Sequence, residues 1–296
     1  MIARNWVAAG QNLRPLGDMR LALLIALTMT AFAANSLLNR VAVDGGYIDP
    51  AGFAVIRVAS GAVVLMALAR IQARQLSFAT RRRFIGATAL TVYMVGFSIA
   101  YLTLDAGLGA LILFGAVQIS MFVITGVMGA GPSARQIAGA AIAFGGLIVV
   151  LNPTHATGTD LLGTLLMVAA GVGWGVYTLV GKSEPDALAG TAANFALALV
   201  PTAIFPLMAG MAMFVTVPGI ALAVVSGAIT SGLGYALWYA ILPRINAVLA
   251  AILMLSVPVL AVLGGVALLG EEVGVRFLFG ALLVLGGISL SIRKPA

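Results

Sequence analysis

Ten apolar segments follow one another along this chain of 296 residues, each about as long as a helix that crosses a lipid bilayer. The hydrocarbon layer is about 30 Å thick, so a crossing helix needs roughly 20 mainly apolar residues. Charge clusters, prolines and glycine-rich turns separate the segments. They cover residues 19–41, 50–70, 84–104, 107–128, 134–151, 161–181, 187–209, 217–241, 245–269 and 273–292. The pattern predicts an all-α integral membrane protein with ten transmembrane helices.

Composition excludes a water-soluble fold, because 62% of the residues are hydrophobic and only 8% are charged, against roughly 25% charged in soluble domains. The 16 Lys and Arg exceed the 9 Asp and Glu, which in a soluble protein would suggest a nucleic-acid partner. In a membrane protein such an excess is typical of cytoplasmic loops, so we expect no nucleic-acid partner. The absence of cysteine excludes disulfides, thiolate metal sites and cysteine nucleophiles.

The loops predict which end of the bundle is cytoplasmic, because Lys and Arg resist translocation. With the N-terminus inside, thirteen of the sixteen basic residues lie on the inner side, and Arg40, Arg57 and Arg276 are the exceptions. Both termini are therefore expected in the cytoplasm. The first segment also fits a signal peptide ending near Ala33, but its removal would leave nine spans with a poorer charge distribution, so we expect it to remain.

The two halves of the chain resemble each other. Arg135, Gly139 and the pair Gly145-Gly146 recur 141 residues later as Arg276, Gly280 and Gly286-Gly287. Each half holds five spans, and an odd number makes the second half enter the membrane from the opposite face. We therefore predict a cytoplasmic segment 1–18, a five-helix repeat 19–152, an inverted repeat 153–292 and a cytoplasmic tail 293–296. The alternative is a chance match among glycine- and alanine-rich helices.

Inverted repeats of this kind place a substrate site near the membrane midplane, between the halves. Rocking of one helix bundle against the other then exposes that site to each side in turn. We therefore predict that the two five-helix repeats surround a central cavity and that the protein works by alternating access.

The ninth and tenth spans carry a recognisable motif. Ser256-Val-Pro258 is followed by an apolar stretch to Leu268-Leu269-Gly270-Glu271, and then by the glycines of the tenth span. This motif resembles the signature of the drug/metabolite transporter superfamily, specifically its EamA-type ten-helix members. The resemblance covers residues 19–292 and implies a bacterial inner-membrane exporter of amino acids or other metabolites, nearest to the aromatic amino-acid exporters. In the first half, Gln118 to Ser120 replaces the expected proline and Gly129 to Pro132 replaces Leu-Gly-Glu.

Aromatic side chains are candidates for the walls of the substrate site. Tyr93, Phe97 and Tyr101 share one face of the third span, and Tyr235, Trp238 and Tyr239 share one face of the eighth. Rings offer an apolar surface with a polar tip, which suits an organic solute, and they also attract cations. The alternative is that these rings pack between helices or anchor the protein at the membrane interface.

Polar side chains within the spans are the second group of candidates, because such groups tend to face a cavity or another helix. An asparagine amide suits the ends of an amino acid but also joins helices. Arg57 lies about 10 Å inside its span and suits a carboxylate; the alternative is snorkelling or pairing with Asp49 or Asp105. The predicted substrate-binding residues are Asn35, Asn39, Arg57, Tyr93, Tyr101, Gln118, Trp174, Tyr177, Tyr235, Trp238 and Tyr239.

The sequence therefore predicts a secondary transporter whose partners are a small-molecule substrate and the lipid bilayer. All nine acidic residues lie near predicted span ends and the single His155 lies in a loop, so a facilitative mechanism without a buried proton relay is expected. A multidrug or organic-cation exporter and a nucleotide-sugar-like carrier are alternatives. We find no catalytic residues, no metal ligands, no cofactor site and no phosphate-binding loop.

Overall fold

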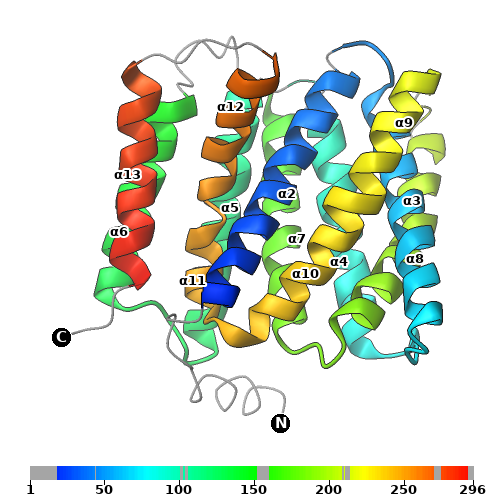
Figure 1. The fold of residues 1–296 in the computed structure, drawn as a ribbon, viewed down its shortest axis with the longest axis horizontal. Coiled ribbons are helices and arrows are strands. Elements are labelled where there is room, and N and C mark those ends of the chain that lie inside the picture. The colour runs from blue at the N-terminus through cyan, green and yellow to red at the C-terminus, as the bar shows by residue number, and fades with distance from the viewer. Residues whose placement is uncertain are drawn as a thin grey trace.

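The computed structural model describes residues 19–43, 45–100, 103, 106–151, 160–208, 210, 214–269 and 275–292. In these ranges the chain forms a bundle of helices that run side by side in roughly the same direction, up or down (Figure 1). The helices are α2 Met19–Val43, α3 Pro50–Ile71, α4 Arg81–Ala100, α5 Ala106–Val127, α6 Ala134–Leu151, α7 Leu161–Lys182, α8 Ala187–Met208, α9 Val217–Val225, α10 Gly234–Ile241, α11 Ala247–Leu253, α12 Ser256–Leu269 and α13 Val275–Ile292. The predicted segments 1–18 and 293–296 lie outside the described residues.

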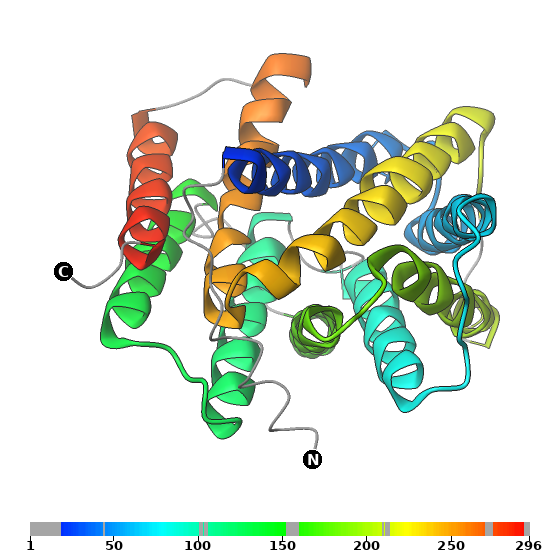
Figure 2. The same ribbon diagram turned by 60° about the horizontal axis from the view of Figure 1, so that its bottom comes forward.

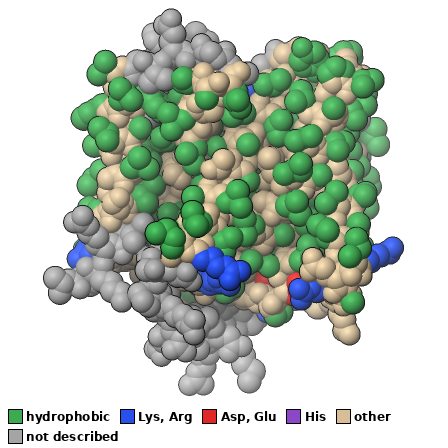
Figure 3. All heavy atoms as spheres, in the orientation of Figure 1, with side chains coloured by type: hydrophobic (Ala, Val, Ile, Leu, Met, Phe, Trp, Pro, Cys, Tyr) green, Lys and Arg blue, Asp and Glu red, His purple; other side chains and the backbone are tan. Residues whose placement is uncertain are grey.

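The predicted multi-pass architecture is confirmed. Among the described residues, seven helices are long and apolar enough to cross a membrane, and three shorter apolar helices occupy the fourth, fifth and tenth predicted spans. Hydrophobic side chains cover the visible sides of the bundle, and most of the visible Lys and Arg lie along its lower edge (Figure 3). We call this the basic end; α2 begins there, and α3 and α7 end there at Arg70 and Lys182.

The eighth span is not the single α-helix that its sequence pattern predicts. Between α9 and α10 lies a π-helix, η2 (Ser226–Leu233), and α10 runs into a short 3-10 turn, η3 (Leu242–Arg244). π-Helical segments are rare and are frequently found at functional sites. Glycines let η2 lie directly against α3: a Cβ on Gly227 would clash with the carbonyl oxygen of Arg57.

The ninth span is also interrupted. Helix α11 ends at Leu253 and α12 begins at Ser256, with Met254 and Leu255 in a turn between them. Pro258 has no N–H group and therefore cannot donate to the carbonyl four residues earlier, at Met254. The hydroxyl of Ser256 instead donates to the carbonyl of Leu253 (2.7 Å), which satisfies one backbone oxygen at the break.

The packing of the helices brings the two halves of the chain into close contact. Helix α4 packs along α7, α3 along α8 and η2, and α2 against α12, η2 and α10, while α6 and α13 form a pair at one side (Figures 1 and 2). Nearly every extended interface therefore joins one helix from residues 19–151 to one from residues 160–292.

The repeated glycines form the contact between α6 and α13. A Cβ on Gly146 would lie 2.7 Å from the carbonyl oxygen of Gly280, and one on Gly287 would clash with that of Gly139. Their neighbours Gly145 and Gly286 have nothing within 4 Å of such an atom. Small residues allow membrane helices to approach closely and pack by van der Waals contact.

Aspartates begin three of the helices. The carboxylate of Asp49 accepts from the backbone N–H groups of Ala51 and Gly52 (2.9 Å each), that of Asp160 accepts from Gly163 (2.7 Å), and that of Asp186 from Ala189 (3.0 Å). Such caps satisfy the free donors of a first helical turn. The hydroxyl of Thr103 also donates to Asp160, and these bonds hold the pKa of that carboxyl below its usual value.

The glycine contact predicts the effect of two adjacent substitutions. Gly287→Ala forces a methyl group against the backbone of α6 and should destabilise the protein by about 1–3 kcal/mol, the usual cost of overpacking. Gly286→Ala is the matched control and should be neutral or slightly stabilising, because alanine favours helix. Thermal unfolding in detergent measures both; equal midpoints for the two variants would contradict this packing of α6 against α13.

Candidate substrate site

A cluster of aromatic rings fills the interior of the bundle. Trp174 of α7 lies at its centre, with ring centroids 4.9 Å from Tyr93, 4.7 Å from Tyr235, 5.6 Å from Tyr177 and 5.6 Å from Phe32. These are the separations at which aromatic pairs interact favourably. We call this group, with the residues that extend it, the aromatic cluster; the additional members are Phe195, Trp238 and Tyr239.

The structure thus brings together six predicted residues: Tyr93, Trp174, Tyr177, Tyr235, Trp238 and Tyr239. Each of them is buried, with 8% or less of its surface exposed. For Tyr93, Tyr235, Trp238 and Tyr239 this burial excludes an anchor at the membrane interface and agrees equally with the other alternative, packing between helices. Phe32 of α2 lies one turn before the predicted Asn35, whereas Phe195 of α8 was not expected, because its span carries no periodic aromatic pattern.

Arg57 enters this cluster from α3. Its Nε donates to the hydroxyl of Ser231 and a terminal nitrogen donates to the hydroxyl of Tyr235, both at 2.7 Å. The residue is only 2% exposed, which excludes snorkelling to the surface. Asp49 does not pair with it, since the Asp49 carboxylate caps α3 and accepts from the backbone N–H of Phe214 (2.7 Å). Asp105, the other predicted partner, lies outside the described residues.

The charge of Arg57 has no counter-ion in the part of the chain that the structure describes. The ion pairs found there join Arg74 to Asp186 and Arg83 to Glu184. The hydroxyls of Ser231 and Tyr235 occupy two of the five N–H donors of the guanidinium, and the hydroxyl of Tyr93 also interacts with it. A buried charge is costly unless it is paired and hydrogen-bonded. The site therefore presents a desolvated cation with unused donors.

Asn35 of α2 shares the same hydroxyl. Its side-chain oxygen accepts from Ser226, from Thr230 (3.2 Å) and from Ser231 (3.3 Å), all on η2. Because Ser231 accepts from Arg57, its own proton points to Asn35, which fixes the orientation of the amide. The amide nitrogen donates to no group among the described residues, so Asn35 offers a second donor near Arg57.

The other predicted residues lie elsewhere or are incompletely placed. Gln118 on α5 is buried, and neither atom of its amide has a partner in the described structure. Asn39 is half-buried, one turn beyond Asn35, and no contact joins it to the cluster. Tyr101 lies outside the described residues. A groove of about 550 Å³ between α5, α6 and α7 is lined by apolar side chains such as Ile112 and Phe144 and by none of the predicted residues.

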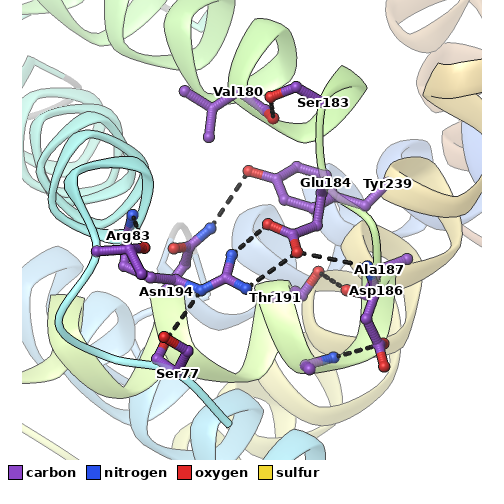
Figure 4. Close-up of polar contacts among 12 residues, drawn as sticks. Ser77, Arg83, Val180, Ser183, Glu184, Asp186, Ala187, Thr191, Asn194 and Tyr239 are labelled. Carbon is purple, nitrogen blue, oxygen red and sulfur yellow. Dashed lines mark hydrogen bonds and ion pairs between the residues drawn. The ribbon is translucent and has the colours of Figure 1, made fainter. Parts of the chain in front are cut away.

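A second polar cluster, at the basic end, was missed in the sequence. Arg83 of α4 forms a two-point ion pair with Glu184, whose side chain is fully buried (Figure 4). Glu184 follows the sixth span among charged residues, so its position suggested an exposed loop. Glu184 does lie near a span end, as all nine acidic residues were expected to, but its side chain is buried. No spacing rule links two residues 101 positions apart.

Metal binding has no support in the described ranges, where no group of three His, Cys, Asp or Glu side chains could hold an ion. The site is instead built from a guanidinium, hydroxyls, an amide and rings. Such groups bind and orient an organic solute through hydrogen bonds and apolar contact; they include no nucleophile with an adjacent base.

The shared hydroxyl of Ser231 gives a direct test of this geometry. Ser231→Ala removes an acceptor from the buried Arg57 and a donor from Asn35, so it should destabilise the protein by about 1–3 kcal/mol. Ser289→Ala is the control, because that exposed hydroxyl bonds only to its own helix. We expect a lower thermal midpoint in detergent for the first variant alone; similar midpoints would show that Ser231 does not hold this network.

Comparison with known proteins agrees with this architecture. Residues 161–293 match the EamA-like transporter family. A Pseudomonas aeruginosa protein, itself named uncharacterized, is 44% identical over 273 residues, covering 92% of this chain and 94% of that protein. A protein of Archaeoglobus fulgidus named an uncharacterized transporter is 24% identical over 92% of this chain and 97% of its own.

A solved crystal structure has the same fold, with a TM-score of 0.75 at 20% identity over 90% of this chain and 98% of the other. The resemblance seen in the ninth and tenth spans is confirmed, and with it the expectation of a membrane transporter and not an enzyme. From its helices, its motif and these relatives, the chain carries an EamA-like transporter family domain over residues 161–293.

Proposed function

We propose that this protein is a secondary transporter that exports amino acids or related small carboxylates across the bacterial inner membrane by alternating access. The observation that carries the proposal is Arg57, a buried cation without a carboxylate partner among the described residues. Fixed, desolvated guanidinium groups bind carboxylates through two parallel hydrogen bonds. A substrate carboxylate would supply the missing counter-charge.

The groups around Arg57 support a substrate with an apolar body. Tyr235 and Ser231 hold the guanidinium in place, and Asn35 adds an amide donor. The rings of Trp174 and Tyr93 lie on the neighbouring helices α7 and α4. Amino acids with apolar or aromatic side chains therefore match the site best, in keeping with the predicted likeness to aromatic amino-acid exporters.

The two alternative substrates differ in how they would meet Arg57. An organic cation would be attracted by the rings but repelled by the unpaired guanidinium, so the site disfavours it. A nucleotide-sugar-like substrate carries phosphate, which a guanidinium binds as readily as a carboxylate. This second candidate is distinguished from amino acids by the transport assay.

Alternating access depends on an inverted repeat of residues 19–152 and 153–292, and three features of the packing support it. In the repeat, Gly146 corresponds to Gly287 and Gly139 to Gly280. The contact of Gly146 with Gly280 is therefore equivalent to that of Gly287 with Gly139, between α6 and α13. The repeat relates α2 to α7, α4 to α10 and α5 to α12. The packing of α7 against α4 and α5 therefore has its counterpart in the packing of α2 against α10 and α12. Aspartates cap the second helix of each half, α3 and α8.

Those two capped helix ends lie at opposite ends of the bundle, as an inversion requires. Helix α8 starts beside the basic end, where Asp186 pairs with Arg74 (3.4 Å), whereas α3 starts at the other end. We further propose that the basic end, and with it both termini, faces the cytoplasm, because positively charged loops are retained there.

The transport assay tests the role of Arg57. Purified protein in liposomes preloaded with unlabelled solute is given labelled amino acids, organic cations or nucleotide sugars, and counterflow is measured. We expect uptake of amino acids, which Arg57→Gln should lower roughly tenfold or more, since a hydrogen bond to a charged group contributes about 1.5–3 kcal/mol. Arg57→Lys should recover part of the uptake, because it keeps the charge but not the planar fork.

Arg244→Gln serves as the matched control, since Arg244 is exposed at the basic end. Its counterflow should equal that of the unmodified protein. Uptake of organic cations in preference to amino acids, or full amino-acid uptake by Arg57→Gln, would refute the substrate proposal. Uptake of nucleotide sugars that depends on Arg57 would favour the second candidate.

A facilitative mechanism is proposed because no acidic side chain lies in the aromatic cluster and Glu184 is occupied by Arg83. Proton-coupled carriers usually carry free acids or histidines along the path. Liposomes with a pH gradient but equal substrate on both sides should therefore show no net accumulation. Uphill accumulation driven by the pH gradient alone would reject this mechanism while leaving the substrate assignment intact.

A further inference from the structure

Side chains from α4, α8, α10 and the turn after α7 bond to one another in pairs and to the backbone at the basic end of the bundle. We call these residues the basic-end cluster: Arg83 of α4, Glu184 after α7, Asn194 of α8 and Tyr239 of α10 (Figure 4). All four are buried, although they lie at or near the ends of their helices. The cluster shares Tyr239 with the aromatic cluster, but none of its four residues is among the hydrogen-bond partners of Arg57.

All three nitrogens of the Arg83 guanidinium donate hydrogen bonds. The two terminal nitrogens of Arg83 each donate to one oxygen of Glu184, one of them at 2.9 Å, and its Nε donates to the carbonyl of Ser77 (3.1 Å). The side chains are 8% and 0% exposed. The pair thus ties the loop before α4 and the start of α4 to the turn between α7 and α8.

Behind the pair lies a second contact between helices. The hydroxyl of Tyr239 accepts from the amide of Asn194 (3.3 Å) and donates to the backbone carbonyl of Tyr177 (3.0 Å). This links α10 to α8 and α7. Trp238 and Tyr235, on the same helix, continue the packing towards the aromatic cluster.

Glycines on neighbouring helices make room for three of these four side chains, those of Asn194, Glu184 and Tyr239. A Cβ on Gly86 would lie 2.8 Å from the Asn194 amide, one on Gly190 would lie 2.6 Å from the Glu184 carboxylate, and one on Gly181 would overlap the Tyr239 ring. The side chains therefore fit into notches in the facing helices. Separation of these helices would empty the notches.

The opposite end is joined in a different way. There the α2–α3 and α8–α9 loops meet through backbone hydrogen bonds, from Asp49 to Phe214 (2.9 Å) and from Thr216 to Tyr47 (3.0 Å), with an isolated bridge between Ile48 and Val215. The corresponding loops at the basic end, α7–α8 and α3–α4, are instead joined through Arg83, Glu184 and Ser77. The loops at the basic end are thus joined by an ion pair, and the corresponding loops at the opposite end by backbone hydrogen bonds.

We propose that the Arg83–Glu184 pair is the latch of a gate at the basic end, closed in this conformation and broken when that end opens. The proposal rests on the proposed function, since a gate implies a transport cycle. A pair buried from water holds strongly while both partners are present, and its loss leaves an unpaired buried charge. In the open state each partner would be hydrated, where such pairs contribute little. The latch therefore has two distinct states.

The absence of cysteine from the chain allows a clean test. Thr191→Cys places a single thiol on α8 beside Glu184, at a position that is fully buried (Figure 4). A membrane-impermeant maleimide is applied to protein in liposomes, and the rate of labelling is measured without substrate. Breaking the latch with Glu184→Gln should raise this rate about tenfold through a shift of population towards the open state.

Three further variants separate opening from other effects. The exchange Arg83→Glu with Glu184→Arg restores an ion pair and should return labelling to the slow rate. Arg74→Gln breaks the exposed pair with Asp186 and should leave the rate unchanged. Ser291→Cys, buried between α6 and α13, reports general unfolding and should stay slow in every variant.

Unchanged labelling of Thr191→Cys in the Glu184→Gln protein would overturn the latch. Equal acceleration at Thr191→Cys and Ser291→Cys would also overturn it, because the pair would then stabilise the fold as a whole. The assay uses no substrate, so its outcome is independent of the Arg57 transport assay. Failure of the substrate proposal and failure of the latch are therefore distinguishable.

Discussion

A lipid bilayer offers no water to a buried polar group, so every such group in this protein must find its partner within the chain or in what the chain binds. The arrangement around Arg57 follows from that requirement. Ser231 serves both the guanidinium and Asn35, and Tyr235 takes a second N–H. Within this network, partners are still lacking for the unused donors of Arg57, for its charge and for the amide nitrogen of Asn35, and elsewhere among the described residues the buried amide of Gln118 also lacks them. A substrate with a carboxylate is the simplest group that supplies both of the partners that Arg57 lacks.

The π-helix has a physical role in this network. Ser226 and Ser231 would stand about 140° apart on an α-helix at 100° per residue and could not both face α2. Hydrogen bonding from i to i+5 widens the turn, and both hydroxyls then reach the side-chain oxygen of Asn35. Gly227 allows the widened segment to remain in contact with α3. The irregular backbone and the buried asparagine therefore depend on each other.

The spans were predictable because the bilayer imposes one length and one polarity on each of them. Ten segments read from hydropathy and charge correspond to helices that begin and end within a few residues of the expected positions. The burial of Tyr93 and Tyr235 was also predictable in part, since helical spacing puts each of them on the aromatic face of its own span and both faces were expected to line one site. The π-helix, the Phe195 contact and the pair of Arg83 with Glu184 depend on distant residues, and no local pattern encodes them.

The proposed site and the proposed gate share helix α10. Tyr235 bonds to Arg57 at one turn of this helix, and Tyr239 bonds to Asn194 at the next. A carboxylate bound to the unused donors of Arg57 would lie beside the Tyr235 hydroxyl that bonds to the same guanidinium, and so would contact the helix that carries Tyr239. Coupling between two sites requires an element that both sites bias. Helix α10 is short and contacts both Arg57 and the basic-end cluster. Substrate binding and opening of the basic end would therefore both act on this helix.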